Sequence, residues 1–390
     1  MMTQTYQFKV PPMIVHGPGA AKEAGSLAKG LGKKALIVTD MALEKLGLLN
    51  EVQNSLEVAG IPFAVYNKVV TEPTMDFVEE GLKIFKEVQA EFLIAVGGGS
   101  PMDAAKAIAV LVTNPGKISD FAGANKIPRP GSPLMAIPTT AGTGSEVTQS
   151  TIITDTSRDV KMLIASPHII SRVALVDPLL TLTMPQKLTA ATGIDALTHA
   201  IEAFVSVKAQ PITDTLALQA IRVIAGNIRP AWSNGDNVEA RTNMMIGAHQ
   251  AGMAFSNSSV ALVHGMARPI GAYFHVPHGV SNAALLPTII EFSIPGNPKR
   301  YAAIAEAMGE ITEGLSVLDA AYLAADAAGG LNVDLKVPTL RELGVEEKKF
   351  NSIVEQMAAD AIASGSPGNN PRKATKEEIV ELYRRAFSQE

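Results

Sequence analysis

The distribution of apolar residues in the first half of the chain predicts short buried strands that alternate with helices. Continuous apolar runs cover residues 35–39, 61–66, 92–96 and 134–137, and further strands are expected at 151–154 and 173–176. Helical patterns separate the first three runs, as at residues 75–88. Short apolar strands alternating with helices are typical of a parallel sheet that helices cover on both faces.

The pattern changes after about residue 183. Long amphipathic or apolar stretches, typical of helices, occupy residues 186–206, 212–228, 238–255 and 315–328. We therefore predict two domains, an α/β Rossmann-like domain over residues 1–183 and an all-α domain over residues 184–390. The length of 390 residues agrees with this division, because it exceeds what one ordinary core supports.

Composition narrows the possible functions. Apolar residues make up 47% and charged residues 18%, which is typical of a globular chain. The net charge of −5 and the lack of Lys/Arg runs argue against nucleic-acid binding. No apolar run approaches the roughly 18 residues of a membrane span, and the first residues do not resemble a signal peptide. We expect a soluble cytoplasmic protein.

The chain has no cysteine, which excludes disulfides, thiolate metal sites and a cysteine nucleophile. Any metal must therefore be held by His, Asp or Glu.

Two polar loops follow predicted strands. The first, Gly97-Gly98-Gly99-Ser100, precedes a helical stretch, and its glycines would let the backbone approach a pyrophosphate. Taken alone, it fits a plain glycine-rich turn equally well, because its spacing is not GxGxxG. The second loop, residues 138–145, is rich in Thr, Ser and Gly. Both loops are expected at the carboxyl ends of parallel strands, where such folds bind ligands.

Asp40 ends another predicted strand. A carboxylate there can accept hydrogen bonds from ribose hydroxyls and would repel a 2′-phosphate, which favours NAD over NADP. Asp is also a good helix N-cap, and the two roles are compatible.

Candidate metal ligands lie in the second half. Asp195 and His199 are four residues apart, so on a helix they share one face, although a surface Asp–His pair is the better explanation of these two taken alone. His264 lies in an apolar helix-like run, and His278 lies between a proline and a glycine. One carboxylate and three imidazoles suit Fe²⁺ or Zn²⁺, and also Mn²⁺, Co²⁺ or Ni²⁺.

Four motifs carry a family resemblance: GGGSPMDAAK at 97–106, PTTAGTGSEVT at 138–148, GIDALTHAIE at 193–202 and VHGMARPIGAYFHVPHG at 263–279. In this order they resemble the iron-dependent (group III) alcohol dehydrogenases, and the similarity extends over essentially the whole chain. The resemblance implies a Rossmann-like domain followed by a helical domain, as in dehydroquinate synthase-like folds, with the active site between them.

The resemblance also implies roles for individual residues. The metal ligands, which are also the catalytic set, would be Asp195, His199, His264 and His278. The cofactor-binding positions would be Asp40, Gly97, Gly98, Gly99, Ser100, Asp103, Thr139, Thr140, Thr143, Ser145 and Lys161. Phe255 would line the substrate pocket.

One position departs from the family pattern. Many members carry a histidine four residues after the third ligand, where this chain has Arg268. Arginine cannot act as a base near neutral pH. Arg268 either binds an anionic or polar substrate group or forms a structural ion pair. His275 either supplies the missing imidazole or is a solvent-facing loop residue.

The resemblance thus predicts a metal-dependent, NAD-linked alcohol dehydrogenase or aldehyde reductase. It would transfer a hydride between a small primary alcohol or diol and NAD, with Fe²⁺ as the expected metal and Zn²⁺ as the alternative. Family members are usually dimers or larger homo-oligomers, and the same is expected here. A hydroxyacid–oxoacid transhydrogenase and a dehydroquinate synthase-like lyase are the alternatives on this fold. A non-enzymatic nucleotide-binding protein would leave the four-ligand set unexplained.

Overall fold

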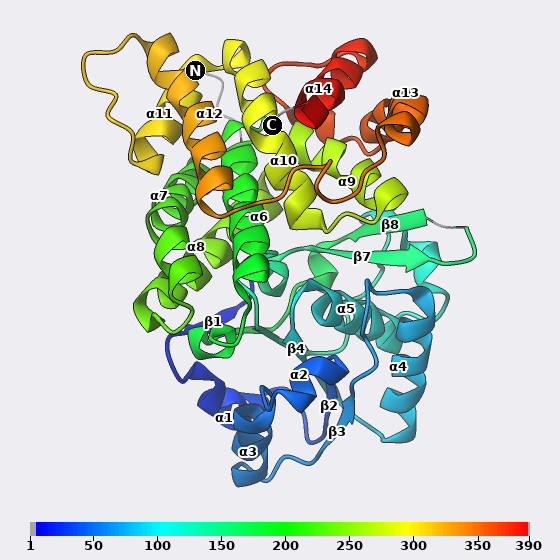
Figure 1. Cartoon of the computed structure of the whole chain (residues 1–390). Helices are drawn as coiled ribbons and strands as arrows, with labels where there is room; N and C mark the ends of the chain where they lie inside the picture. Colours follow the sequence, from blue (N-terminus) through cyan, green and yellow to red (C-terminus); the bar gives the residue numbers. More distant parts are fainter. Residues whose placement is uncertain (1–4, 159, 389–390) are drawn as a thin grey trace. The chain divides into compact units, whose positions relative to one another are not determined.

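The computed structural model describes residues 5–158 and 160–388, which form two compact units (Figure 1). Residues 8–183 make up the first unit, and residues 184–388 make up the second together with residues 5–7. The sequence placed the whole N-terminus in the first domain. The structure groups residues 5–7 with the second unit, where the side-chain amide of Gln210 donates a hydrogen bond to the carbonyl of Gln7 at 3.1 Å.

A six-stranded sheet forms the centre of the first unit, in the order β1-β9-β6-β4-β2-β3, and every pairing in it is parallel. Its strands are β1 (Met13–His16), β2 (Ala35–Val38), β3 (Phe63–Tyr66), β4 (Phe92–Gly97), β6 (Leu134–Pro138) and β9 (Val173–Val176). The parallel α/β sheet predicted from the apolar runs is therefore confirmed. β1, a short strand at the sheet edge, was not predicted.

The sheet is buried on both faces. Leu36 and Val38 of β2 belong to one apolar core, and Ala35 and Ile37 of the same strand belong to another. Alternate side chains of a strand point to opposite faces, so a strand without a polar face must be covered twice. This explains why the strands appear as continuous apolar runs in the sequence.

Helices and 3₁₀ turns cover these faces. The first core includes side chains of α4 and α5, and the second includes those of η1, α1 and α3. The α-helices of this unit are α1 (Ala24–Ala28), α2 (Met41–Lys45), α3 (Asn50–Val58), α4 (Met75–Glu87) and α5 (Gly99–Thr113). The 3₁₀ turns are η1 (Ala20–Glu23), η2 (Ile118–Phe121), η3 (Ser145–Val147), η4 (Pro167–Ile169) and η5 (Pro178–Thr181).

A second, three-stranded sheet has the order β5-β8-β7. Its strands are β5 (Gly123–Ala124), β7 (Ser150–Asp155) and β8 (Val160–Ala165), and β7 and β8 pair antiparallel. The strand expected at 151–154 therefore belongs to a separate hairpin. β8, which alternates between exposed and buried positions from Lys161 to Ile164, was not predicted.

The topology of the large sheet defines where a ligand would bind. From β2 the chain adds β3 on one side and then β4 on the other. Open α/β sheets bind ligands beyond the carboxyl ends of the strands at such a reversal. Val38 of β2 pairs with Ala95 of β4, and Gly97 of β4 pairs with Pro138 of β6. The three strands therefore end close to one another at the same edge of the sheet.

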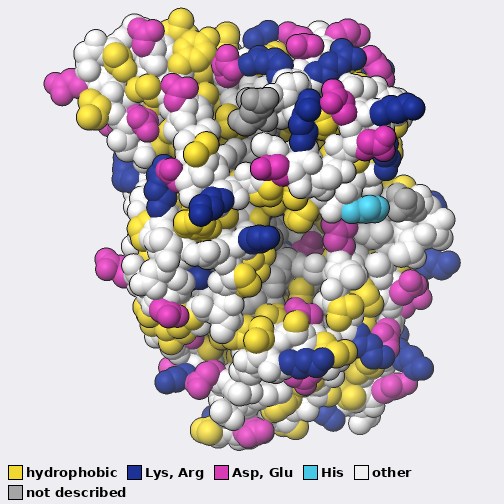
Figure 2. Space-filling view, viewed as in Figure 1, with side chains coloured by type: hydrophobic (Ala, Val, Ile, Leu, Met, Phe, Trp, Pro, Cys, Tyr) yellow, Lys and Arg dark blue, Asp and Glu magenta, His cyan; other side chains and the backbone are white. Residues whose placement is uncertain are grey.

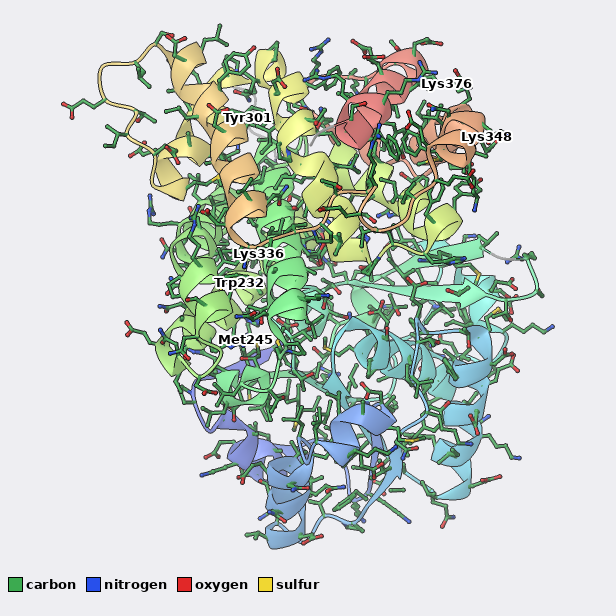
Figure 3. The ribbon with its side chains drawn as sticks, viewed as in Figure 1. Trp232, Met245, Tyr301, Lys336, Lys348 and Lys376 are labelled. Atoms are coloured by element: carbon green, nitrogen blue, oxygen red, sulfur yellow. The ribbon has the colours of Figure 1, made fainter. Side chains whose placement is uncertain are left out.

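The described part of the second unit is helical and contains no strand. Its α-helices are α6 (Gln186–Val205), α7 (Pro211–Ser233), α8 (Val238–Asn257), α9 (Leu262–Phe274), α10 (His278–Ser293), α11 (Pro298–Met308), α12 (Val317–Asp334), α13 (Glu347–Ala363) and α14 (Lys376–Ser388). The 3₁₀ turns η6 (Ile294–Gly296) and η7 (Ser366–Asn369) lie between them. Figure 3 shows Trp232 of α7 near Lys336, whose ammonium lies 5.9 Å from the ring centre.

Within the described ranges, no helix is both long and apolar enough to cross a membrane. On the face shown in Figure 2, acidic and basic side chains are interspersed.

Candidate metal centre and nucleotide loops

Three helices of the second unit bring the four candidate ligands together. Asp195 and His199 lie one turn apart on α6, His264 lies on α9, and His278 is the first residue of α10. Ligand atoms of Asp195, His199 and His264 all lie within 4.8 Å of one another. The Nε2 atom of His278 lies 3.7 Å from Oδ1 of Asp195. The four side chains can thus face one small volume.

Three of these side chains are buried and one is accessible. Asp195, His199 and His264 are at most 6% exposed, whereas the side chain of His278 is 45% exposed. The rings of His199 and His264 stack with centroids 4.4 Å apart. Phe255, expected to line a substrate pocket, stacks on His199 at 4.2 Å. Apolar packing therefore holds the imidazoles in place.

Glu202 of α6 was not identified from the sequence. One carboxylate oxygen accepts a hydrogen bond from Nδ1 of His264, and the other accepts one from the backbone N–H of Val263, both at 2.6 Å. In the neutral form of His264, a proton on Nδ1 leaves the lone pair on Nε2, which lies 3.6 Å from Asp195. Metal-binding histidines are commonly oriented in this way by a carboxylate.

Asn282 of α10 was also missed. It is fully buried, and its amide nitrogen donates a hydrogen bond to Oδ1 of Asp195 at 2.6 Å. A signal existed for both missed residues. Glu202 lies three residues after His199, and Asn282 lies four residues after His278, so each shares a helix face with a candidate ligand.

The carboxylates and imidazoles of the centre stabilise one another's charged forms. Burial by itself would raise the pKa of Asp195, but the imidazoles of His199, His264 and His278 hold it well below its usual range. Burial would lower the pKa of His264, but Glu202 and Asp195 outweigh burial and raise it to about 9. The cluster therefore favours a cationic partner for its carboxylates, either protons or a metal ion.

In the first unit, the two polar loops touch. The backbone N–H of Thr139 donates to the carbonyl of Gly97 at 3.0 Å. A Cβ atom at Gly98 would lie 3.5 Å from the Thr140 side chain, and one at Gly99 would lie 3.1 Å from that of Thr143. Gly99 and Ser100 begin α5, so the helix N-terminus faces the same region.

Asp40 follows β2 and caps α2. Its Oδ1 accepts hydrogen bonds from the backbone N–H groups of Ala42 and Leu43 at 2.8 and 2.9 Å. No hydrogen bond to Oδ2 is found among the described residues. The helix-cap role is present, and one carboxylate oxygen remains available for a ribose.

Asp103 and Ser145 link α5 to the second loop. The Ser145 hydroxyl donates to Oδ1 of Asp103 at 2.8 Å, and the backbone N–H of Ile152 donates to Oδ2 at 2.9 Å. Burial raises the pKa of Asp103, although Lys106 opposes the rise. Both oxygens of Asp103 thus have protein donors.

Lys106, another residue missed in the sequence, reinforces this link. It is fully buried in α5, and its ammonium donates to the hydroxyls of Ser145 and Thr148 and to the carbonyl of Ser150 at 2.7–2.9 Å. Burial lowers the pKa of Lys106 to about 8, against the attraction of Asp103 and Glu146. One cation therefore ties residues 145–150 to the helix that follows the GGGS loop.

Two further residues are placed differently. Lys161, expected at the nucleotide, lies on β8 and forms an ion pair with Glu72 at 2.7 Å. Within the described chain, no hydrogen bond joins it to either loop. His275 is exposed and ends α9 in a left-handed conformation, with φ of 57°.

Comparison with known proteins agrees with these features. The iron-containing alcohol dehydrogenase family model matches residues 11–178, and the C-terminal model of the Fe-containing alcohol dehydrogenase family matches residues 189–387. The chain is 42% identical to 1,3-propanediol dehydrogenase of Citrobacter freundii, over 99% of this chain and all of the relative. It is also 42% identical to lactaldehyde reductase of Escherichia coli K12, over 91% and 92% of the two chains.

A solved structure of 1,3-propanediol oxidoreductase superposes with a TM-score of 0.96 at 42% identity, covering 98% of this chain and all of that one. The chain therefore belongs to the iron-containing (group III) alcohol dehydrogenase family of oxidoreductases, as its sequence motifs predicted.

Proposed function

We propose that this chain catalyses the reversible, NAD-linked oxidation of a small primary alcohol or diol, with a divalent metal held by Asp195, His199, His264 and His278. The observation that carries the proposal is the buried cluster of one carboxylate and two imidazoles, with His278 beside it. A surface Asp–His pair, the simpler interpretation of the α6 motif, does not account for this burial.

The donor set fits Fe²⁺, and Zn²⁺ is the alternative. Imidazole nitrogens with one carboxylate and no sulfur suit either ion. When bound, the ion would supply a Lewis acid for the alcohol oxygen, and NAD would supply the hydride acceptor.

The protein's own residues orient these groups. Glu202 fixes the tautomer and ring orientation of His264, and Asn282 fixes one oxygen of Asp195. Phe255 covers one face of His199 and keeps water from it. This rigidity supports a site that needs little reorganisation when substrate arrives.

Loop geometry supports a nucleotide site in the first unit. We propose that Gly97, Gly98, Gly99 and Ser100 receive the pyrophosphate at the start of α5. Thr139, Thr140, Thr143 and Ser145 would form the other side of the site. The available oxygen of Asp40 suits a ribose hydroxyl and disfavours a 2′-phosphate, so NAD is the expected cofactor.

The remaining predicted positions have secondary roles in this proposal. Asp103 would act mainly by holding Ser145, because both carboxylate oxygens already accept hydrogen bonds. Lys161 would reach the nucleotide only after leaving Glu72, and an exposed ion pair of this kind costs little to break. The functional domain limits at residues 183 and 184, a cytoplasmic location and a homo-oligomeric state stay predictions.

The substrate proposal draws on the named relatives, which are enzymes of 1,3-propanediol and lactaldehyde. Small diols and hydroxyaldehydes are accordingly the first compounds to test.

The test is an NAD⁺ reduction screen over primary alcohols and diols, after separate reconstitution with Fe²⁺, Zn²⁺, Mn²⁺ and Ni²⁺ and elemental analysis of each preparation. We expect about one metal per chain and release of free NADH. Loss of bound metal in Asp195→Ala, with the metal retained in the matched variant Asp214→Ala, would support the ligand assignment. No activity in any metal form would overturn the proposal, and oxidation without release of NADH would favour a transhydrogenase.

A further inference from the structure

Arg268 lies one helical turn after His264 on α9. Side chains four residues apart on a helix lie on the same face, about 6 Å apart along the axis. Arg268 therefore lies on the face of α9 that carries a candidate metal ligand.

The contacts of Arg268 differ from those of a structural ion pair. Its Nη1 donates to the hydroxyl of Ser366, in η7, at 3.0 Å. Among the described residues, no carboxylate lies within ion-pair distance of its guanidinium. A guanidinium has five N–H donors, so donors remain for a ligand. The residue is only partly buried, although burial lowers the pKa of its guanidinium.

The acidic group whose charge acts on Arg268 is Glu202, which opposes the effect of burial. This carboxylate already accepts two hydrogen bonds at 2.6 Å, from His264 and from the backbone of Val263. Arg268 therefore has a negative charge in its surroundings but no carboxylate of its own.

The charge balance of the centre points to an anionic ligand. With a divalent ion bound, the carboxylates of Asp195 and Glu202 would neutralise the ion, and the positive charge of Arg268 would remain. A neutral histidine at this position would leave the same centre without net charge, which suits a neutral alcohol. A carboxylate on the substrate would compensate Arg268, because guanidinium and carboxylate form paired hydrogen bonds.

We infer that Arg268 binds a carboxylate at the far end of the substrate, so that this chain prefers short ω-hydroxycarboxylates and their aldehydes to neutral diols. The inference rests on the proposed dehydrogenase function and names its substrate class. Because Arg268 and His264 share one face of α9, a short carbon chain would separate a reacting carbon at the metal from a carboxylate at Arg268.

The first experiment compares 4-hydroxybutyrate with 1,4-butanediol, which differ at one end of the molecule. The expected kcat/KM ratio favours the acid in the metal-loaded wild type and falls at least about tenfold in Arg268→Gln. Arg268→His should favour the diol, and Arg268→Lys should retain part of the preference, because it keeps the charge without the paired donors. Arg229→Gln, which removes an exposed arginine paired with Asp334, is the matched control and should leave the ratio unchanged.

The second experiment measures binding without turnover. Calorimetry would compare butyrate with its neutral isostere butyramide on the metal-loaded protein with NAD⁺. We expect the wild type and Arg229→Gln to prefer butyrate, and Arg268→Gln to lose the preference. An acid-to-diol ratio that does not depend on residue 268, together with equal binding of butyrate and butyramide, would overturn the inference.

The two proposals fail in different ways. NAD⁺-dependent oxidation of butanediol, with no effect of residue 268 on acid preference, would leave the dehydrogenase standing and refute the role of Arg268. Arg268-dependent binding of butyrate, with no oxidation of either compound, would support the anion site and refute the dehydrogenase.

Discussion

Replacing Lys106 by methionine tests how the second nucleotide loop is held. Methionine keeps most of the length and apolar surface of the lysine stem but removes the ammonium. The three acceptors on Ser145, Thr148 and Ser150 then lose their buried donor. We expect residues 145–150 to separate from α5 and the nucleotide site to lose its shape.

The size of the effect follows from two opposing contributions. Three hydrogen bonds to a charged donor contribute roughly 5–9 kcal/mol if each is worth about 1.5–3 kcal/mol. Keeping the buried ammonium charged costs about 3 kcal/mol, because its pKa falls from 10.5 to about 8. The net loss of stability in Lys106→Met is then about 2–6 kcal/mol. This corresponds to roughly 5–20 °C in Tm for a unit of this size.

The pH dependence provides a second measurement. Burial lowers the pKa of Lys106 to about 8, so between pH 8 and 10.5 the unfolded chain binds this proton more tightly than the folded chain. This group therefore makes the wild type more stable as pH rises through that window, whereas methionine contributes nothing. The Tm difference between wild type and Lys106→Met should widen from pH 8 to pH 10.

Thermal melts at pH 7, 8, 9 and 10, together with NADH titrations followed by nucleotide fluorescence, would measure these effects. NADH should bind Lys106→Met at least about tenfold more weakly, a difference of about 1.4 kcal/mol. Lys68→Met is the control, because Lys68 is exposed and its ion pair with Glu80 should contribute less than about 1 kcal/mol. A Tm within about 2 °C of wild type with unchanged NADH affinity would refute the reasoning.

Three other substitutions test the remaining contacts. Glu202→Gln removes the charged acceptor from Nδ1 of His264, so metal retention against a chelator should fall about 10- to 100-fold, and unchanged retention would contradict this role. Gly279→Ala would place a Cβ atom 2.2 Å from the carbonyl oxygen of Ala191, so the start of α10 must move. The free energy of unfolding should fall by about 1–3 kcal/mol, and an unaltered melting curve would argue against that contact. Asp40→Ser keeps a good N-cap but removes the charge, so the NADP⁺/NAD⁺ ratio of kcat/KM should rise, and a constant ratio would exclude repulsion by Asp40.

The parallel sheet could be predicted because its strands are buried on both faces. A strand such as β4 must then be continuously apolar, and this signal needs no knowledge of its partners. β1 and β8 give weaker signals. β1 lies at the sheet edge and is exposed at both ends, and β8 alternates because it belongs to a hairpin with exposed residues. The pairing of β1 with β9, and that of β8 with β5, joins segments far apart in the sequence, which the local pattern does not contain.

The residues around the candidate ligands illustrate a second limit. Asp195, His199, His264 and His278 stood out because their side chains are typical metal ligands in a chain with few histidines. Glu202 shares their helix face, but a glutamate there could equally face solvent. Only the packing of α9 against α6 decides that it meets His264. Lys106 was missed for the opposite reason, since a lysine is rarely fully buried.

The unequal exposure of the candidate ligands has a consequence for how the site would acquire its metal. Asp195, His199 and His264 are enclosed, whereas the side chain of His278 remains 45% exposed at the first turn of α10. An ion could enter or leave past His278 without unfolding of the helices around the other three ligands. Occupancy would then follow the metals available in the surroundings, and the purified protein would carry a mixture that depends on the growth medium.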